Sequence, residues 1–301
     1  MFGTSKPYSK FLKITPPKAA VDRHGVAIVS TVKNEGRYIS DWVKFHLAVG
    51  VRHFHIYDDG SSDDTRDVLR ALLTPDQLTL IPWIARMEDS ALHKKLNGQV
   101  LAFAHAVLNF GSNYRWMAFI DVDEFLLPKT GKTVEQALVG AGGFPNISLP
   151  WHMFGRGGHK TRPVGSILRN FTIRSEDPLS KVKHASNFKC IVDPCEVTEV
   201  SVHRFETREF GEYTANDEGR QYTRRGRKSA SFYSSRYLQL NHYYSKSDEE
   251  LQEKLARGPA SPGTAENYRS RVILAVENIE HKTVEDLAMI EFLDRNGIDI
   301  Q

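Results

Sequence analysis

The sequence predicts an α/β protein whose mostly parallel sheet is flanked by helices on both faces. Short β-branched apolar runs alternate with stretches of helical period between residues 26 and 120, in the order β-α-β-α-β-α-β. Two of these runs end in clusters of carboxylates, which is where open parallel sheets place their ligand sites. The expected strands are 26–32, 53–57, 78–81 and 116–120, and the expected helices are 38–49, 64–73 and 90–109.

The ends of these elements have recognisable signals. Residues 26–32 read Val-Ala-Ile-Val-Ser-Thr-Val, the composition of a buried strand. Gly50 closes the first helix, and Ser62 or Asp63 provides an N-cap for the second. The third helix carries an apolar stripe at helical spacing. Its members are Leu96, Val100, Phe103, Ala104, Val107 and Leu108.

The second half of the chain is less regular. Residues 207–230 are polar and basic and are predicted to form a long mobile loop. Ser247 and Glu250 form a capping box that starts a helix at residue 248, and a Gly- and Pro-rich break follows at 258–263. The other expected elements are helices 133–139, 248–257, 264–280 and 283–295 and strands 147–151, 188–192 and 200–205.

Composition excludes several classes of protein. Of the 301 residues 40% are hydrophobic, which allows a substantial core, and the net charge of +3 is too small to imply nucleic acid as a partner. Cys190 and Cys195 are too few for a disulfide framework and indicate a reducing compartment. No run approaches about eighteen apolar residues, and residues 1–25 lack the apolar centre of a signal peptide. We therefore expect a cytoplasmic location.

The first candidate site element is the polar loop after the first strand, with Lys33, Asn34 and Glu35. Such a loop can contact a base or a ribose, or it can simply start the following helix. It is neither a phosphate-binding P-loop nor a GxGxxG dinucleotide motif, because the chain contains neither pattern in this position.

The second element is Asp58-Asp59-Gly60-Ser61-Ser62-Asp63, which follows the second strand. An aspartate at a strand end can accept a hydrogen bond from a base imide or a ribose hydroxyl. Asp, Gly and Ser also favour turns for local reasons alone. The position between a strand and a helix favours Asp58 and Asp59 as nucleotide contacts.

The third element is Asp121-Val122-Asp123 at the end of the fourth strand. Because residues i and i+2 of a strand face the same side, Asp121 and Asp123 are expected to converge on one cation, Mg²⁺ or Mn²⁺. That cation would hold a diphosphate. A solvated turn is the alternative, and Glu124 is expected to point away from the two aspartates.

The fourth element is the run 238–247, a strand that ends in His242 and is followed by Lys246. It can deliver a neutral imidazole to a metal and an ammonium group to phosphate oxygens. Lys254 and Arg257 share a face of the next helix. A structural histidine and a solvated basic face are the alternative.

These motifs together resemble those of inverting glycosyltransferases of the glycosyltransferase-A fold, closest to the family-2-like and family-92-like group. They occur in the family's order and cover roughly residues 26–258. The family's usual pair of serines after Phe154-Gly155 is replaced here by Arg156-Gly157. The matching pieces are Val32-Lys33-Asn34-Glu35, Asp58 to Asp63, Asp121 to Phe125, Trp151 to Gly155, Asn241-His242-Tyr243, Lys246-Ser247 and Arg257-Gly258.

The resemblance implies a Rossmann-type, mostly parallel sheet with an irregular acceptor half and C-terminal helices. It implies an irregular arm over 1–25, a catalytic domain over 26–258 and helices over 259–301. The nucleotide-binding half would be 26–130 and the acceptor half 131–258. It also places Asp59 near the base, Asp121 and Asp123 with His242 around Mn²⁺ or Mg²⁺, and Lys246 or Arg257 near the diphosphate.

The implied reaction moves a sugar from a nucleoside-diphosphate sugar, UDP-linked by resemblance, to a hydroxyl of a glycan or glycolipid. Asp123 would act in catalysis through the metal, which neutralises the leaving diphosphate. Inverting transfer also needs a general base in reach of the acceptor hydroxyl. The candidates for this base are Glu176, Asp177, Asp193 and His159.

Other functions share parts of this pattern. A nucleotidyltransferase would need a Gly-rich basic loop after the first strand, and a haloacid-dehalogenase-type phosphatase would carry its DxD after the first strand and not the fourth. A non-catalytic binder of anionic polymers would rest on the basic segment 220–228. Within an enzyme, that segment is expected to contact an acidic glycan or, peripherally, an anionic membrane surface at its inner face.

Overall fold

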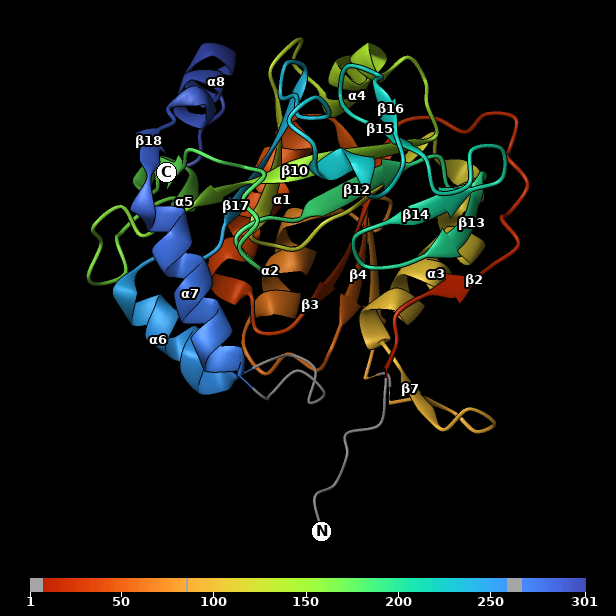
Figure 1. The fold of residues 1–301 in the computed structure, drawn as a ribbon, viewed down its shortest axis with the longest axis horizontal. Helices are drawn as coiled ribbons and strands as arrows, with labels where there is room; N and C mark the ends of the chain where they lie inside the picture. The colour runs from red at the N-terminus through yellow and green to blue at the C-terminus, as the bar shows by residue number, and fades with distance from the viewer. Residues whose placement is uncertain (1–7, 85, 259–266) are drawn as a thin grey trace.

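The computed structural model describes residues 8–84, 86–258 and 267–301. A twelve-stranded mixed sheet runs through the molecule and carries helices on both faces (Figure 1). Two smaller three-stranded sheets lie beside it. This architecture confirms the predicted fold class, a mostly parallel sheet flanked by helices.

The first half forms the parallel part of the sheet. Its four strands have the order β5-β4-β3-β8, and all neighbouring pairs are parallel. The chain order therefore reverses between β3 and β8, which is the point where doubly wound sheets bind ligands. The elements are β3 (Val26–Val32), α1 (Gly36–Ala48), β4 (Val51–Asp58), α2 (Thr65–Leu72), β5 (Leu78–Pro82), α3 (Gly98–Phe110) and β8 (Trp116–Phe119).

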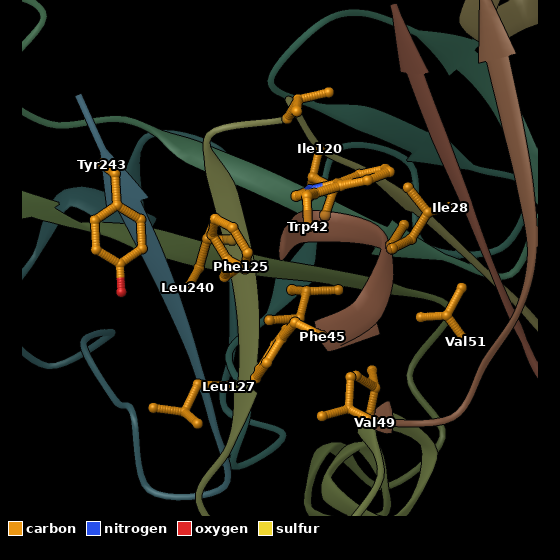
Figure 2. Close-up of a cluster of buried hydrophobic side chains, with 14 of the residues drawn as sticks. Ile28, Trp42, Phe45, Val49, Val51, Ile120, Phe125, Leu127, Leu240 and Tyr243 are labelled. Carbon is orange, nitrogen blue, oxygen red and sulfur yellow. The ribbon is translucent and has the colours of Figure 1, made fainter. Parts of the chain in front are cut away.

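The two faces of this sheet bury alternate residues of β3. Val26 and Ile28 belong to a core that includes Trp42 of α1, whereas Ala27 and Val29 belong to a second core on the α3 side. Figure 2 shows the first core, in which α1 packs against the strands. Trp42 also donates its Nε1–H to the backbone oxygen of Glu124 at 2.9 Å, so α1 fixes the start of β9.

The second half adds mainly antiparallel strands. β12 (Phe188–Val192) lies antiparallel between β8 and β10 (Asn146–Phe154). β17 (Leu238–Tyr243) pairs with β10 in parallel and with β9 (Glu124–Pro128) in antiparallel fashion. Pairing on both edges holds β17 in the interior of the sheet.

Two sequence predictions, one in each half of the chain, were wrong in their bounds. The helix expected at 90–109 begins at Gly98, because Asn97 accepts hydrogen bonds from two backbone N–H groups and caps it, and the preceding residues form the hairpin of β6 (Glu88–Asp89) and β7 (Lys94–Leu96). The strand expected at 200–205 is instead the turn between β13 (Val197–Val200) and β14 (Phe205–Thr207).

The segment 207–230 is more structured than the predicted loop. It contains β15 (Thr214–Ala215), β16 (Gln221–Tyr222) and the 3₁₀ turn η3 (Gly226–Lys228). Arg227, which belongs to the basic segment 220–228 of the predicted mobile loop, is buried. The predicted capping box of Ser247 and Glu250 starts α6 (Asp248–Arg257), and the helix expected at 133–139 is α4 (Val134–Leu138), which also starts with a capping box.

The C-terminal segment also returns to the sheet. The helix expected at 264–280 corresponds to α7 (Tyr268–His281), which packs beside α6 (Figure 1), while 259–266 and most of the expected break lie outside the described residues. In place of one helix at 283–295, β18 (Thr283–Glu285) pairs with β11 (Ile173–Ser175) and α8 (Ala288–Asn296) follows. The short α5 (Ile167–Asn170) and the two-residue strands β1 (Tyr8–Ser9) and β2 (Leu12–Lys13) complete the elements used below.

In the described parts of the chain, helices fall short of the length and apolar character that crossing a bilayer demands.

Candidate active site

The loops after β3 and β4 are joined by hydrogen bonds. Asn34 has a left-handed backbone, with φ of 56°, and its N–H donates to Ser61 Oγ at 2.9 Å. Its side-chain oxygen in turn accepts from the N–H of Ser62 at 2.8 Å. Gly36 donates its N–H to Asp63 Oδ2 at 2.9 Å. The first two predicted site elements therefore form one rigid unit at the carboxyl ends of neighbouring parallel strands.

The two aspartates of this unit have different roles. Asp58 is buried, accepts from the Ser61 N–H at 3.0 Å and so holds the turn. Asp59 is about one-third exposed and lies between Lys33, at 3.7 Å, and Arg86, at 3.3 Å. Asp59 is thus the accessible carboxylate, and Lys33 lies beside it.

The DxD segment is a turn and not the end of a strand. β8 ends at Phe119, and the backbone N–H of Glu124 donates to the backbone oxygen of Asp121 at 3.1 Å. The prediction that Asp121 and Asp123 share one face of a strand is therefore wrong. Asp121 accepts from Lys189 Nζ at 2.8 Å and from Gln99 Nε2 at 2.9 Å.

The carboxylates of Asp123 and Glu124 instead converge with the imidazole of His242. One ligand atom from each of these residues lies within 4.8 Å of the other two. His242 Nε2 is 3.4 Å from Asp123 Oδ2, and His242 Nδ1 is 3.9 Å from Glu124 Oε1. The cause is the register of β17 and β9, which places His242 directly opposite Glu124. Glu124 thus points toward this cluster, contrary to expectation.

Two polar atoms of this acidic cluster have no hydrogen-bond partner. Glu124 Oε1 and His242 Nδ1 are both buried and unsatisfied. Leaving such atoms unpaired costs free energy, so each marks a position where a further group would bind favourably. Carboxylate oxygens and an imidazole nitrogen are ligand types used by divalent transition metals, and the donor set fits such a cation.

The surroundings of the cluster shift the pKa values of its two carboxyl groups in opposite directions. Burial alone would raise the pKa of Asp123, but the charges of His242, Lys246 and Lys254 outweigh it and hold that pKa below its usual range. For Glu124, burial dominates and raises the pKa well above the usual value, against the opposing charge of Lys189.

A basic group faces the cluster from the segment after β17. Lys246 adopts a left-handed backbone, with φ of 54°, and its ammonium lies 4.1 Å from the centre of the Tyr38 ring. Lys254 donates to the backbone oxygen of Tyr244 at 2.8 Å. Burial lowers the pKa of Lys254 to about 8, and Asp123, Lys246, Arg257 and Glu35 act on it electrostatically.

Glu35 shows that the predicted elements converge. Burial raises its pKa to about 7, with further influence from Lys246, Asp123, Arg257 and, more weakly, Asp121. The loop after β3, the DxD turn and the segment from Lys246 to Arg257 therefore lie within electrostatic reach of one another. A carboxyl group with such a shifted pKa is typical of functional sites.

The general-base candidates lie elsewhere. Asp193 pairs with Arg23 at 2.5 Å and with Arg115 at 2.6 Å. It follows the end of β12, which is antiparallel to β8 and meets the start of β8, so Asp193 lies at the opposite end of these strands from the DxD turn. Asp193 therefore lies apart from the acidic cluster, in a pairing with two arginines.

The other three candidates have no contact with the acidic cluster among the interactions of the described chain. His159 Nε2 is 2.9 Å from the backbone oxygen of Asn170, which gives its ring a structural partner. Glu176 and Asp177 are exposed after β11, and Asp177 accepts from the backbone N–H of Leu179 at 2.8 Å. Sequence reasoning could not place these residues because their positions depend on pairing in the antiparallel half.

Sequence reasoning missed Lys189 and His203. The signal for Lys189 was a lysine inside the apolar run 188–192, because a buried ammonium requires a partner. His203 gave no signal. It lies in the β13–β14 turn, and its ring centroid is 5.5 Å from that of Trp151, which in turn is 4.5 Å from that of His242.

The sheet, its flanking helices and the acidic loops at its switch point match the glycosyltransferase-A architecture expected from the sequence. The model of glycosyltransferase family 92 matches residues 27–275, and the chain belongs to this family.

Curated relatives carry the same family name. A family 92 protein of Ricinus communis is 28% identical over 65% of this chain and 34% of its own length. One of Oryza sativa subsp. japonica is 26% identical over 52% of this chain and 26% of its own, and one of Arabidopsis thaliana is 21% identical over 62% and 32%. The chain thus spans about a third of the length of the curated relatives it matches.

Solved structures show a weaker likeness. Glucosyl-3-phosphoglycerate synthase from Mycobacterium tuberculosis, in complex with Mn²⁺, UDP and glucosyl-3-phosphoglycerate, is 19% identical and covers 44% of this chain and 45% of its own, with a TM-score of 0.28. The complex of that enzyme with Mg²⁺ and UDP has the same identity and TM-score.

Proposed function

We propose that this protein transfers a glycosyl group from a nucleoside-diphosphate sugar, with UDP as the nucleotide, to a hydroxyl of a glycan or glycolipid. Membership of family 92 supports glycosyl transfer as the class of reaction. The observation that carries the proposal is the convergence of Asp123, Glu124 and His242 beside the cationic groups of Lys246 and Lys254.

In this proposal the acidic cluster holds a divalent cation. Two carboxylates and an imidazole would be its protein ligands, and the nitrogen donor favours Mn²⁺ over Mg²⁺, which prefers oxygen. The bound cation would supply Lewis-acid stabilisation of charge on the leaving diphosphate. Asp121 would not be a ligand, because Lys189 and Gln99 already engage its carboxylate.

The surrounding residues would bind and orient the donor. Asp59 offers an accessible carboxylate for a base or ribose, at the rim of the unit formed by the first two loops. Lys246, Lys254 and Arg257 would place positive charge near the phosphate oxygens, where such groups stabilise developing charge. The residues that would bind the base follow β3 and β4, and those that would bind the phosphates follow β8 and β17.

Calorimetric titration with UDP and GDP, with and without Mn²⁺, tests the donor site. We expect Mn²⁺-dependent binding of UDP that is lost in Asp123→Ala. Asp67→Ala is the matched control, because Asp67 is an exposed carboxylate on α2. Release of free sugar or transfer from UDP-sugars by the wild type, and not by Asp123→Ala, then tests the reaction. UDP binding that ignores both Mn²⁺ and Asp123 would contradict the proposal.

A further inference from the structure

A polar hollow lies away from the acidic cluster. It is a shallow hollow that is partly open to solvent. Asn146 and Ser148 at the start of β10 line it, together with residues of the β13–β14 turn and of the segment around η3. Met153 pairs with His242 in the neighbouring strand β17. It lies five residues after Ser148 along β10, which corresponds to about 16 Å at the usual rise of a strand. The hollow is therefore a separate site.

Three arginines line this hollow: Arg204, Arg224 and Arg227. Arg227 is only 6% exposed. Its Nη1 donates to Ser148 Oγ at 3.1 Å and to the backbone oxygen of His203 at 2.8 Å, while its guanidinium lies 4.5 Å from the Phe188 ring centre. The Arg227 side chain is thus fixed in place.

The charge of Arg227 is not compensated. Its Nε is buried without a hydrogen-bond partner, and across the described chain no carboxylate forms an ion pair with it. Since a guanidinium stays protonated, burying it alone is costly. Burial lowers the pKa of Arg227, the Cys190 thiol opposes this shift, and the charges of Arg224 and Arg204 add to it.

The other charged groups of the hollow do not form an ion pair with Arg227. Arg204 pairs with Glu199 at 3.1 Å, and its Nε is also buried and unpartnered. Arg224 is exposed, and its guanidinium has no carboxylate within ion-pair distance in the described residues. Glu206 and Glu212 line the rim. Three carboxylates, those of Glu199, Glu206 and Glu212, therefore act on Arg204, whereas the deepest guanidinium, that of Arg227, has no carboxylate partner among the described residues.

We propose that this hollow binds an oxyanion, namely the carboxylate, sulfate or phosphate group of a small ion or of an acidic glycan. Guanidinium groups present N–H donors in a fork that matches the oxygens of such anions. Ser148 and Arg227 would form the floor, and Arg224 would close over the anion from the exposed side. Binding here requires neither a metal nor a nucleotide.

Isothermal titration with sodium sulfate and sodium phosphate tests the proposal, at an ionic strength held constant with sodium chloride. We expect one saturable site. Arg224→Gln should raise the Kd about ten-fold, the loss typical of a charge-assisted hydrogen bond. Arg225→Gln is the matched control, because Arg225 is an equally exposed neighbour that does not line the hollow. Arg227→Lys, with its folding checked by circular dichroism, should weaken binding further.

A second arm identifies the source of the anion. Uronate-containing or sulfated oligosaccharides are titrated beside neutral ones of equal length and beside the free ions. Tighter binding of the acidic oligosaccharides would show that the anion is carried by a glycan, and equal binding of ions and oligosaccharides would show a site for the ion itself. Absence of a saturable site, or equal loss in Arg224→Gln and Arg225→Gln, would overturn the proposal.

Discussion

Lys189 Nζ lies 2.8 Å from Asp121 Oδ2 and 3.6 Å from Glu124 Oε2. The Lys189 side chain is 1% exposed and that of Glu124 is fully buried. One ammonium therefore links the first carboxylate of the DxD turn to the carboxylate that faces His242. The Glu124 side chain also accepts from the backbone N–H of Asp121 at 2.8 Å, which closes the turn.

Replacing Lys189 should destabilise the protein. Lys189→Met keeps the length of the side chain but leaves two carboxylates without their cation, and breaking a buried pair costs about 3 kcal/mol. Urea unfolding without metal should show this loss, and Mn²⁺ should restore part of it. Lys132→Met, at an exposed lysine, should have no effect, and an equally small effect at Lys189 would contradict the buried pairing.

His242 should matter more for metal binding than Asp121. His242→Ala removes a member of the acidic cluster, and we expect its Mn²⁺ affinity, measured by electron paramagnetic resonance of the free ion, to fall at least about ten-fold. Asp121→Asn should have a smaller effect, because that carboxylate is bound to Lys189 and Gln99. The reverse order would show that Asp121, and not Glu124, completes the ligand set.

A side chain at Gly36 should displace the side chain of Asp64. A Cβ at this position would lie 1.8 Å from Asp64 Oδ1 and 3.0 Å from Asp63 Oδ2. Gly36→Ala should therefore lower the free energy of unfolding by about 1 kcal/mol, the low end for overpacked sites, because the exposed Asp64 side chain can turn away. Thermal unfolding measures the loss. Adding Asp64→Ala should recover much of it, because it removes the nearest atom, and no recovery would show that the clash is not the cause.

His46 should make stability fall in acid. It is fully buried, with Nδ1 2.8 Å from the backbone oxygen of Trp42 and Nε2 accepting from the N–H of Leu126 at 3.3 Å. Burial lowers its pKa to about 3, so the folded protein keeps it neutral while the unfolded chain protonates near its ordinary value. The contribution of His46 is thus complete above about pH 6.5 and is lost as the pH falls toward 3.

Urea unfolding of wild type and His46→Gln at several pH values measures this contribution. The difference between the two proteins isolates His46 from other buried histidines. Between pH 6.5 and 5 the wild type should lose about 2 kcal/mol more than the variant. Parallel curves would show that His46 titrates normally in the folded state.

Features set by neighbouring residues were predictable from the sequence. Ser247 and Glu250 predicted the start of α6 because a capping box is a local motif, and the β-branched composition of residues 26–32 predicted β3. The helix expected from residue 90 begins only at Gly98, because the start of the predicted apolar stripe belongs to the hairpin before it. The capping hydrogen bonds of Asn97 mark the true start of the helix.

The composition of the acidic cluster could be predicted only in part. His242 was expected near the DxD, but its position opposite Glu124 depends on the pairing of β17 with β9, two strands that are distant in the chain. The expectation that Glu124 faces away assumed a continuous strand, and the turn at Asp121 reverses that orientation. Contacts between distant segments have no local signal in a single sequence.

The interior position of β17 has a consequence for the timescale of motion at the site. Backbone hydrogen bonds hold His242 from both neighbouring strands, and Tyr243 N–H also donates to the backbone oxygen of Asp123 at 2.9 Å. Interior strands open only with the cooperative unit that contains them, whereas loops fluctuate independently. Amide protons of β17 should therefore exchange among the slowest in the protein, and the imidazole of His242 should keep its place while the loops beside it move.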